Sequence, residues 1–483
     1  MISRNFIKAS AIYTLAGALP MASALLLVPF YMADLTTANF GALSICLAFS
    51  ILVQLLVTYS FDSSLYIHYH EFKNDKEKLS RFVSSAFVLM LFIGLGLAII
   101  LLPTGAYILS WFSDGKELAF FPNGWLALGG GVFQALFKVH SNFLQSREKP
   151  ETFFWANLLL FSAIFVLTLL GLKVFPQTLI GPLGGRFVAL GLGSVWVLFR
   201  IFREYGFHFD LPLLGTSFSF NFYSFIYQIQ QWFINYFDRI VMMFYLPLAS
   251  VGVYDFAIKS LVGVELVMNG LHSALIPRVL KLVNIRETKG TSPEINRYYH
   301  GFIAVLMIVA CGAIWLVPMA IEWLSNFLEK PGYSLSTGIV PYIAVLYICR
   351  SVRLFFGLPY SILKYTKPLP VIYAVVAIVK IGGMFLLIPY LGVMGVIAST
   401  AASVLTEILM LYFLSKNRFV FKFNTYKILV APVALTLLVC AGELTGILNA
   451  DLRHFIYCVL AVMMLGFVYR FELKNLKSAV RAN

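Results

Sequence analysis

Continuous apolar runs, each long enough for one membrane-spanning helix, recur along the whole chain and are separated by short polar turns. An α-helix needs roughly 20 apolar residues to cross the hydrocarbon core of a bilayer. Only 12% of the 483 residues are charged, whereas soluble proteins carry about 25%. A water-exposed surface of this size would need more charge. We therefore expect an all-α polytopic membrane protein, and not a soluble enzyme, a disordered chain or a nucleic-acid binder.

The apolar runs predict about 14 transmembrane helices, near 9–31, 39–61, 82–103, 124–145, 153–172, 181–202, 217–247, 251–277, 298–321, 337–363, 369–390, 392–414, 427–447 and 453–470. With the N-terminus inside, most Lys and Arg residues outside the helices fall in inner segments, which is the positive-inside pattern. Both termini are therefore expected in the cytoplasm. The longest loops, 62–81 and 278–297, are polar and too short to fold as separate domains.

Three short motifs recur in the same order in the two halves of the chain. Leu35-x-x-Ala38-x-x-Gly41 returns as Leu246-x-x-Ala249-x-x-Gly252, Gly181-x-x-Gly184 as Gly392-x-x-Gly395, and Lys149-Pro150 as Lys367-Pro368. Each repeat contains six predicted helices, so the chain is expected to form two parallel lobes, 1–205 and 206–414. The remaining segment, 415–483, is expected to contain two further helices and a cytoplasmic tail. A substrate site is expected between the lobes near mid-depth. The alternative is a duplicated structural bundle that transports nothing.

The sequence carries no pattern typical of a cofactor or metal site. The five cysteines lie in apolar stretches without metal-ligand or disulfide spacing. The histidines do not cluster with acids, and no phosphate-binding GxxxxGK[ST] motif occurs. We therefore expect no cofactor, no metal and no enzymatic activity.

The predicted helices contain more basic than acidic residues. The bases are Lys138, Arg186, Arg239, Lys259, Arg350, Arg353 and Lys380, and the acids are Asp238, Glu265 and Glu407, with Asp255 near a helix end. A charge at the centre of a membrane helix costs about 2.5–3.5 kcal/mol on insertion scales. The unpaired bases must therefore face water or bind an anion. This surplus predicts a cationic cavity.

Other interpretations of the same charges stay open. Lys138 and Arg186 could extend toward the membrane surfaces, and Arg350 and Arg353 could pair with Glu265 or Glu407. Asp238 and Arg239 are adjacent, so their side chains diverge by about 100° on a helix. We expect them to face different surroundings and not to form one ion pair.

A polar stripe follows the helix near 217–247. Asn221, Ser224, Gln228, Gln231, Asn235 and Asp238 alternate in spacings of three and four, which places them on one face. Amides beside a cationic cavity suit a hydroxyl-rich anion; the alternative is hydrogen bonding between packed helices. The predicted substrate-binding residues are Arg239, Arg350, Arg353, Lys380, Lys138, Lys259, Gln228, Gln231 and Asn235. Asp238, Glu265 and Glu407 are candidates for coupling to a proton or sodium ion.

Residues 237–259 resemble the helix 7–8 signature of Wzx-type polysaccharide flippases, in the multidrug/oligosaccharidyl-lipid/polysaccharide (MOP) exporter superfamily. The matching residues are Asp238, Arg239, Gly252 and Tyr254. The stretch 12–45, with Pro29 and Phe40-Gly41, is similar to that family's first helix and the turn after it.

The resemblance implies a protein of the bacterial inner membrane that moves undecaprenyl-pyrophosphate-linked oligosaccharide outward by alternating access. Its expected partners are this lipid-linked anionic glycan, membrane lipid and other polysaccharide-assembly membrane proteins. A cation-coupled multidrug exporter of the same superfamily is the first alternative, although the basic surplus opposes it. A polytopic glycan polymerase or acyltransferase is the second, although the outer loops are short.

Overall fold

The computed structural model describes residues 16–17, 19, 23, 25–113, 118–286 and 290–470. They divide into two compact units, which we call the N-unit (Met1–Gly252) and the C-unit (Val253–Asn483). Apart from one isolated bridge between Gly290 and Val420, the described residues contain no β-structure. The prediction of an all-α fold is confirmed.

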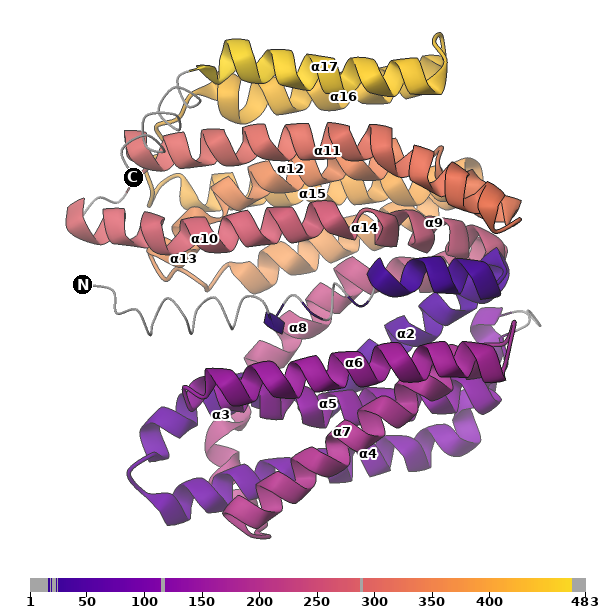
Figure 1. Ribbon diagram of the computed structural model, residues 1–483. Helices are drawn as coiled ribbons and strands as arrows, with labels where there is room; N and C mark the ends of the chain where they lie inside the picture. The colour runs from indigo at the N-terminus through magenta and orange to yellow at the C-terminus, as the bar shows by residue number, and fades with distance from the viewer. Residues whose placement is uncertain are drawn as a thin grey trace. The chain divides into compact units, whose positions relative to one another are not determined.

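The N-unit is a bundle of long helices (Figure 1). After the helix Leu25–Asp34, its elements are α2 (Thr37–Thr58), α3 (Phe61–Phe72), α4 (Lys76–Ser113), the short π-helix η1 (Phe120–Gly124), α5 (Trp125–Ser146), α6 (Pro150–Val174), α7 (Ile180–Tyr205) and α8 (Leu211–Tyr245). α9 (Leu248–Ser260) begins here and continues into the C-unit. Of the predicted first helix, residues 9–15, 18, 20–22 and 24 lie outside the described residues.

The C-unit continues with α10 (Val262–Arg286), α11 (Pro293–Phe327), the 3-10 helix η2 (Pro331–Ser336), α12 (Val340–Phe356), α13 (Leu358–Ile362), α14 (Leu369–Leu391), α15 (Val393–Ser415), the π-helix η3 (Tyr426–Val430), α16 (Ala431–Thr445) and α17 (Ala450–Val468). α14 packs against α15, and α17 packs against α11.

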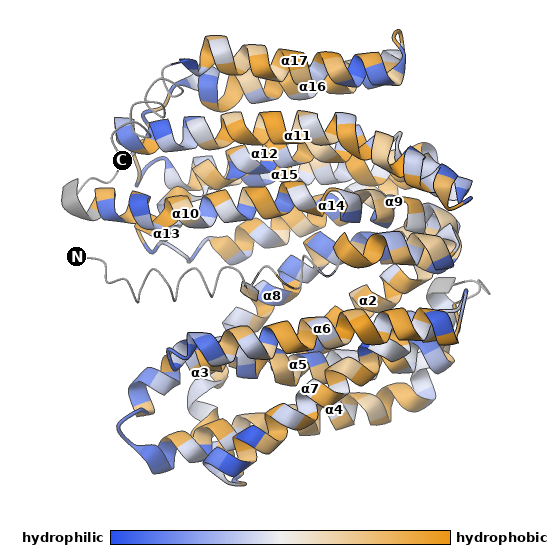
Figure 2. Cartoon of the chain, viewed as in Figure 1, coloured by the Kyte–Doolittle hydropathy of each residue, from blue (hydrophilic) through white to orange (hydrophobic). Residues whose placement is uncertain are grey.

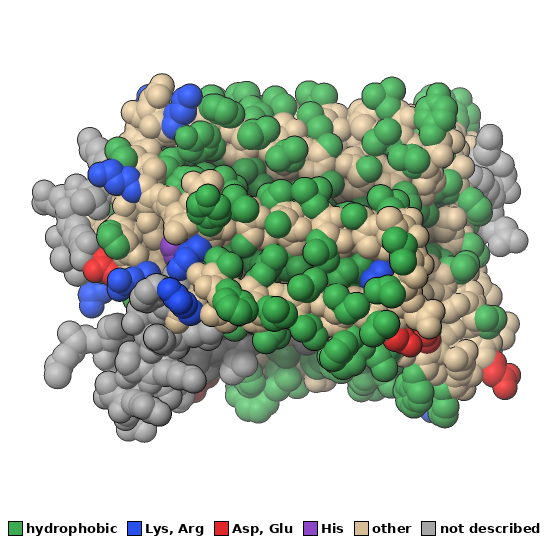
Figure 3. All heavy atoms as spheres, turned by 90° about the horizontal axis from the view of Figure 1, so that it is seen from above, with side chains coloured by type: hydrophobic (Ala, Val, Ile, Leu, Met, Phe, Trp, Pro, Cys, Tyr) green, Lys and Arg blue, Asp and Glu red, His purple; other side chains and the backbone are tan. Residues whose placement is uncertain are grey.

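Eleven helices in the described part of the chain are long and apolar enough to cross a membrane. Figure 2 shows apolar residues along the helices and hydrophilic residues gathered toward helix ends and turns. Figure 3 shows the face that carries α16 and α17, where hydrophobic side chains cover the middle and most visible basic side chains lie toward one edge. The chain is therefore a multi-pass membrane protein, and the total of 14 helices stays a prediction.

Two expectations about local structure were wrong. Residues 62–81 and 278–297 are largely helical, since α3 covers Phe61–Phe72, α4 begins at Lys76 and α10 extends to Arg286. Polar side chains make these segments resemble loops in a hydropathy reading, although they can continue a helix beyond the bilayer. The helix expected at 251–277 is two helices, because the chain breaks at Leu261 between α9 and α10.

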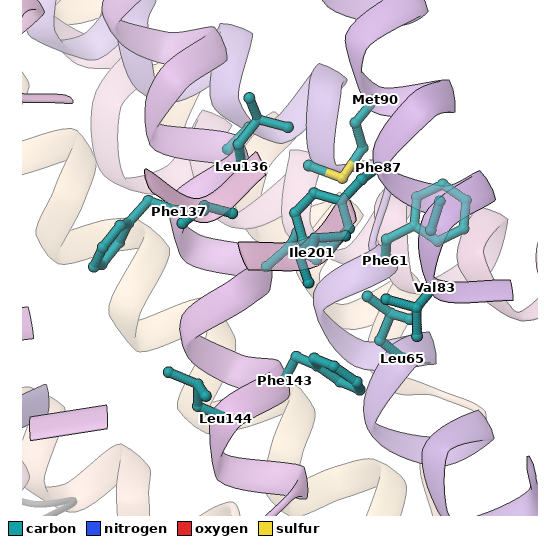
Figure 4. Close-up of a cluster of buried hydrophobic side chains, with 14 of the residues drawn as sticks. Phe61, Leu65, Val83, Phe87, Met90, Leu136, Phe137, Phe143, Leu144 and Ile201 are labelled. Atoms are coloured by element: carbon teal, nitrogen blue, oxygen red, sulfur yellow. The ribbon is translucent and has the colours of Figure 1, made fainter. Parts of the chain in front are cut away.

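Apolar side chains from α3, α4, α5 and α7 form the core of the N-unit (Figure 4). Phe61, Phe87 and Phe143 are fully buried in it. This packing fixes one face of α5, the face with Leu136, Phe143 and Leu144. The other face of the same helix carries polar side chains and is available for a site.

Candidate functional site

A sharp break between α2 and α3 positions the first group of predicted residues. Tyr59 and Ser60 have φ angles of 39° and 58°, the left-handed region that a non-glycine residue occupies at a cost of about 1–3 kcal/mol. The break ends α2 at Thr58 and starts α3 at Phe61. It brings Ser60 and Asp62 within reach of α5 and α8.

Asp62 joins two predicted site residues. Its Oδ2 lies 3.1 Å from the Lys138 Nζ of α5. Gln228 of α8 donates from Nε2 to Asp62 Oδ1 at 3.4 Å and to Ser60 Oγ at 3.1 Å. Asp62 is 8% exposed, so this is a buried polar cluster inside the N-unit. Asp62 was not among the predicted site residues, because residues 62–81 were expected to form a solvated loop.

The expectation that Asp238 and Arg239 face different surroundings was wrong. Arg239 Nη1 lies 2.6 Å from Asp238 Oδ1, and both residues are buried. The same Nη1 donates to the Asn235 carbonyl oxygen at 2.8 Å. The arginine side chain is long enough to fold back toward the preceding turn, so an angular separation of about 100° at the Cβ atoms does not prevent the pair.

The other two predicted site amides of α8, Gln231 and Asn235, have separate environments. Asn235 is exposed, and its Nδ2 donates to the Gln231 carbonyl oxygen of its own helix at 2.8 Å. Gln231 is half-buried, and its Nε2 has no hydrogen-bond partner within the described residues. Of the three predicted amides on α8, only Gln228 therefore joins the Asp62 cluster.

In the C-unit, Arg353 of α12 pairs with Glu407 of α15. Its Nη1 lies 3.2 Å from Glu407 Oε1, and the Glu407 side chain is only 5% exposed. Arg350 lies one turn earlier, with its guanidinium 5.2 Å from the Tyr347 ring centroid. No acidic side chain among the described residues pairs with Arg350. The salt-bridge alternative thus holds for Arg353 and Glu407, and Arg350 carries a charge that no described acidic side chain of the C-unit neutralises.

Lys259, Lys380 and Glu265 lie on three different segments of the C-unit. Lys259 Nζ lies 2.5 Å from Asp255 Oδ2, one turn away on α9. Lys380 on α14 is 3% exposed. Glu265 is half-buried in the first turn of α10 and forms no ion pair within the described residues.

The N-unit also contains a cavity of about 350 Å³, which we call the α5 cavity. The lining residues on α5 are Gln134, Phe137, Lys138, Ser141, Asn142 and Gln145, and facing helices add Gln54, Phe153, Asn157, Phe161 and Arg186. Arg186 donates from Nη2 to Gln134 Oε1 at 2.9 Å. Arg186 therefore points into this cavity.

Sequence reasoning missed the α5 stripe, although its signal is present. Gln134, Lys138, Asn142 and Gln145 follow at spacings of four, four and three, the pattern of one helical face. Of these four residues, only Lys138 was predicted as a site residue. In the part of the chain that the structure describes, Lys138, Arg239, Lys259 and Arg353 pair with acidic side chains.

Two sequence comparisons bear on identity. The family described as "Polysaccharide biosynthesis protein" matches residues 6–283, more than half of the chain. A search of curated proteins gives no match.

Solved structures share the fold over most of the chain. The lipid II flippase MurJ, in an inward closed conformation, is 16% identical with a TM-score of 0.73, covering 97% of this chain and 99% of its own. An inward-facing multidrug-resistance MATE transporter of the MOP superfamily is 12% identical with a TM-score of 0.63, covering 82% and 94%. The MATE multidrug transporter DinF-BH is 13% identical with a TM-score of 0.57, covering 86% and 96%. The fold is that of MOP-superfamily transporters, and the chain belongs to the polysaccharide biosynthesis protein family.

Proposed function

We propose that this chain is a Wzx-type flippase that moves an undecaprenyl-pyrophosphate-linked oligosaccharide across the bacterial inner membrane. The family match supports a role in polysaccharide assembly. The fold supports transport, because the similar structures are those of a lipid II flippase and of multidrug transporters. A transporter of this kind needs no catalytic group of its own.

The proposal rests mainly on one observation. Arg350 lies in a membrane-spanning helix and has no acidic partner among the described residues. An uncompensated charge in the membrane is costly and marks a substrate or ion pathway. A guanidinium binds phosphate oxygens in pairs through its parallel N–H groups. Arg350 therefore suits the pyrophosphate of a lipid-linked glycan and opposes a cationic drug.

The proposed mechanism is alternating access by two six-helix lobes, 1–205 and 206–414, with 415–483 as an addition. The proposed substrate-binding residues are Arg239, Arg350, Arg353, Lys380, Lys138, Lys259, Gln228, Gln231 and Asn235. Outward movement of an anion is favoured by about 2.3 kcal/mol per charge for each 100 mV of membrane potential. Both termini lie in the cytoplasm in this proposal.

Coupling to a proton or sodium ion is proposed for the membrane acids. Asp238 pairs with Arg239 and Glu407 with Arg353, so protonating either acid would leave a buried arginine without its counter-ion. Glu265 forms no ion pair in the described part of the chain. It is therefore the acid that can change charge at the smallest structural cost.

The test is mass spectrometry of lipids from a bacterial strain that lacks this gene. We expect an undecaprenyl-pyrophosphate-linked oligosaccharide to accumulate and surface polymer to disappear. The wild-type gene should restore the polymer, Arg350→Lys should restore part of it, and Arg350→Gln should fail although the protein reaches the membrane. Sensitivity to cationic drugs without glycan accumulation would instead identify a multidrug exporter.

A further inference from the structure

One basic side chain that lines the α5 cavity, Arg186, has no acidic partner among the described residues of the N-unit. Arg186 donates to the neutral amide of Gln134, and its Nε is buried without any hydrogen-bond acceptor. No acidic side chain in the described part of the chain forms an ion pair with it. Arg186 therefore differs from Lys138, which lines the same cavity but pairs with Asp62.

Burying an unpaired guanidinium inside a membrane protein costs a large desolvation free energy. This cost falls when an anion or water molecules contact the guanidinium. Among the described lining residues, the charged side chains are Lys138 and Arg186. Asp62 neutralises Lys138, so the described lining keeps one net positive charge. One net positive charge balances one carboxylate, whereas a pyrophosphate carries at least two negative charges and needs at least one further base, which the proposed set with Arg350 and Lys380 supplies.

The walls of the cavity favour a ligand with hydroxyl groups and an apolar face. Gln54, Asn142 and Gln145 present side-chain amides, which can both donate and accept hydrogen bonds. Phe153 and Phe161 of α6 lie on the same lining, and their rings can pack against the C–H face of a sugar. A volume of about 350 Å³ is near the lower end of the 300–1,000 Å³ range of small-molecule sites.

We propose that the α5 cavity binds the carboxylate of an acidic sugar residue, with Arg186 as its counter-ion and the amides of α5 as partners for its hydroxyl groups. This inference rests on the proposed function and adds to it, because it assigns one anionic sugar of the transported glycan to a subsite within the N-unit. The residues of this subsite belong to the N-unit, whereas Arg350, proposed for the pyrophosphate, belongs to the C-unit.

Binding of free sodium D-glucuronate to the purified full-length protein tests the subsite directly. Saturation-transfer NMR should show saturable binding of glucuronate at least tenfold tighter than that of neutral D-glucose. Arg186→Gln should weaken glucuronate binding at least tenfold, and Arg186→Lys should weaken it less because the charge remains. Lys173→Gln, at an exposed position near the end of α6, should bind as the wild type does.

Gln134→Glu provides a second test that does not remove the arginine. The new carboxylate would lie beside the Arg186 guanidinium, in the place of an amide now 2.9 Å away. It should supply the missing counter-ion, abolish glucuronate binding and raise the melting temperature. Loss of binding together with increased stability cannot arise from misfolding.

Three results would overturn the proposed subsite. Glucuronate could bind no more tightly than glucose, or wild type and Arg186→Gln could bind glucuronate with equal affinity. Chloride or phosphate could also compete as well as glucuronate does, which would identify a site for inorganic anions. These measurements involve no lipid-linked substrate. Failure of the flippase proposal would appear as normal glycan export in the deletion strain, whereas failure of the subsite would appear only in the binding data.

Discussion

Gly41 of α2 and Gly252 of α9, which occupy the same position in the two sequence repeats, lie directly against each other. A Cβ atom added to Gly41 would lie 2.8 Å from the Gly252 backbone nitrogen and would overlap the Leu248 carbonyl oxygen. A Cβ atom added to Gly252 would overlap the Thr37 carbonyl oxygen. The repeated motif thus marks a helix contact that only glycine permits on both sides.

Enlarging Gly41 should destabilise the protein, because the obstructing atoms belong to the backbone and cannot rotate away. Gly41→Ala is expected to cost about 1–3 kcal/mol, as overpacking of a close contact does. Thermal unfolding of the purified protein measures the effect. Gly184→Ala is the matched control, since a Cβ atom there meets nothing within 4 Å. Equal melting temperatures for the two variants would contradict the close contact.

Breaking the Lys138–Asp62 pair from one side should be worse than removing both charges. Asp62→Asn leaves Lys138 without its counter-ion, and we expect a loss of about 1–3 kcal/mol. This is less than the roughly 3–5 kcal/mol of a fully buried pair, because the Lys138 side chain is 32% exposed. In a double-mutant cycle, Asp62→Asn with Lys138→Gln should recover part of the stability. Additive losses would show that the two side chains are not coupled.

Replacing Arg350 should affect glycan export, whereas replacing Arg353 should affect the stability of the protein. Arg353→Gln leaves the Glu407 carboxylate buried without its partner, so the melting temperature should fall, and Glu407→Gln should restore it. Arg350→Gln removes no ion pair and should lose glycan export with little loss of stability. Export assays and thermal unfolding on the same variants separate the two effects. A destabilised Arg350→Gln protein with export in proportion to its folded fraction would refute this division.

Glu265 should determine the dependence of transport on an ion gradient. In proteoliposomes, the wild type should move lipid-linked glycan faster when a proton or sodium gradient is imposed. Glu265→Gln cannot change charge and should transport at one rate with or without the gradient. Glu322→Gln, at an exposed site on α11, is the control. An unchanged gradient response in Glu265→Gln would exclude this acid as the coupling site.

The sequence alone determined the fold class and much of the helix order. Apolar segments of membrane-spanning length form helices, because each polar backbone group in the hydrocarbon core needs a hydrogen-bond partner within the same segment. Some glycines of the repeated motifs stand where helices approach closely, as Gly41, Gly252 and Gly395 do, whereas Gly184 and Gly392 have open space around them. The surplus of basic over acidic residues in the membrane helices is visible in the sequence alone.

Only the tertiary structure decided which of those bases are neutralised. Pairing depends on side chains far apart in the sequence, such as Lys138 with Asp62 and Arg353 with Glu407. It also depends on local rotamers, which join Asp238 to Arg239 against the expectation from helix geometry. The length and periodicity of apolar segments can be read directly from the sequence. An ion pair instead requires two charged atoms within a few ångströms of each other, and only the folded chain determines that distance.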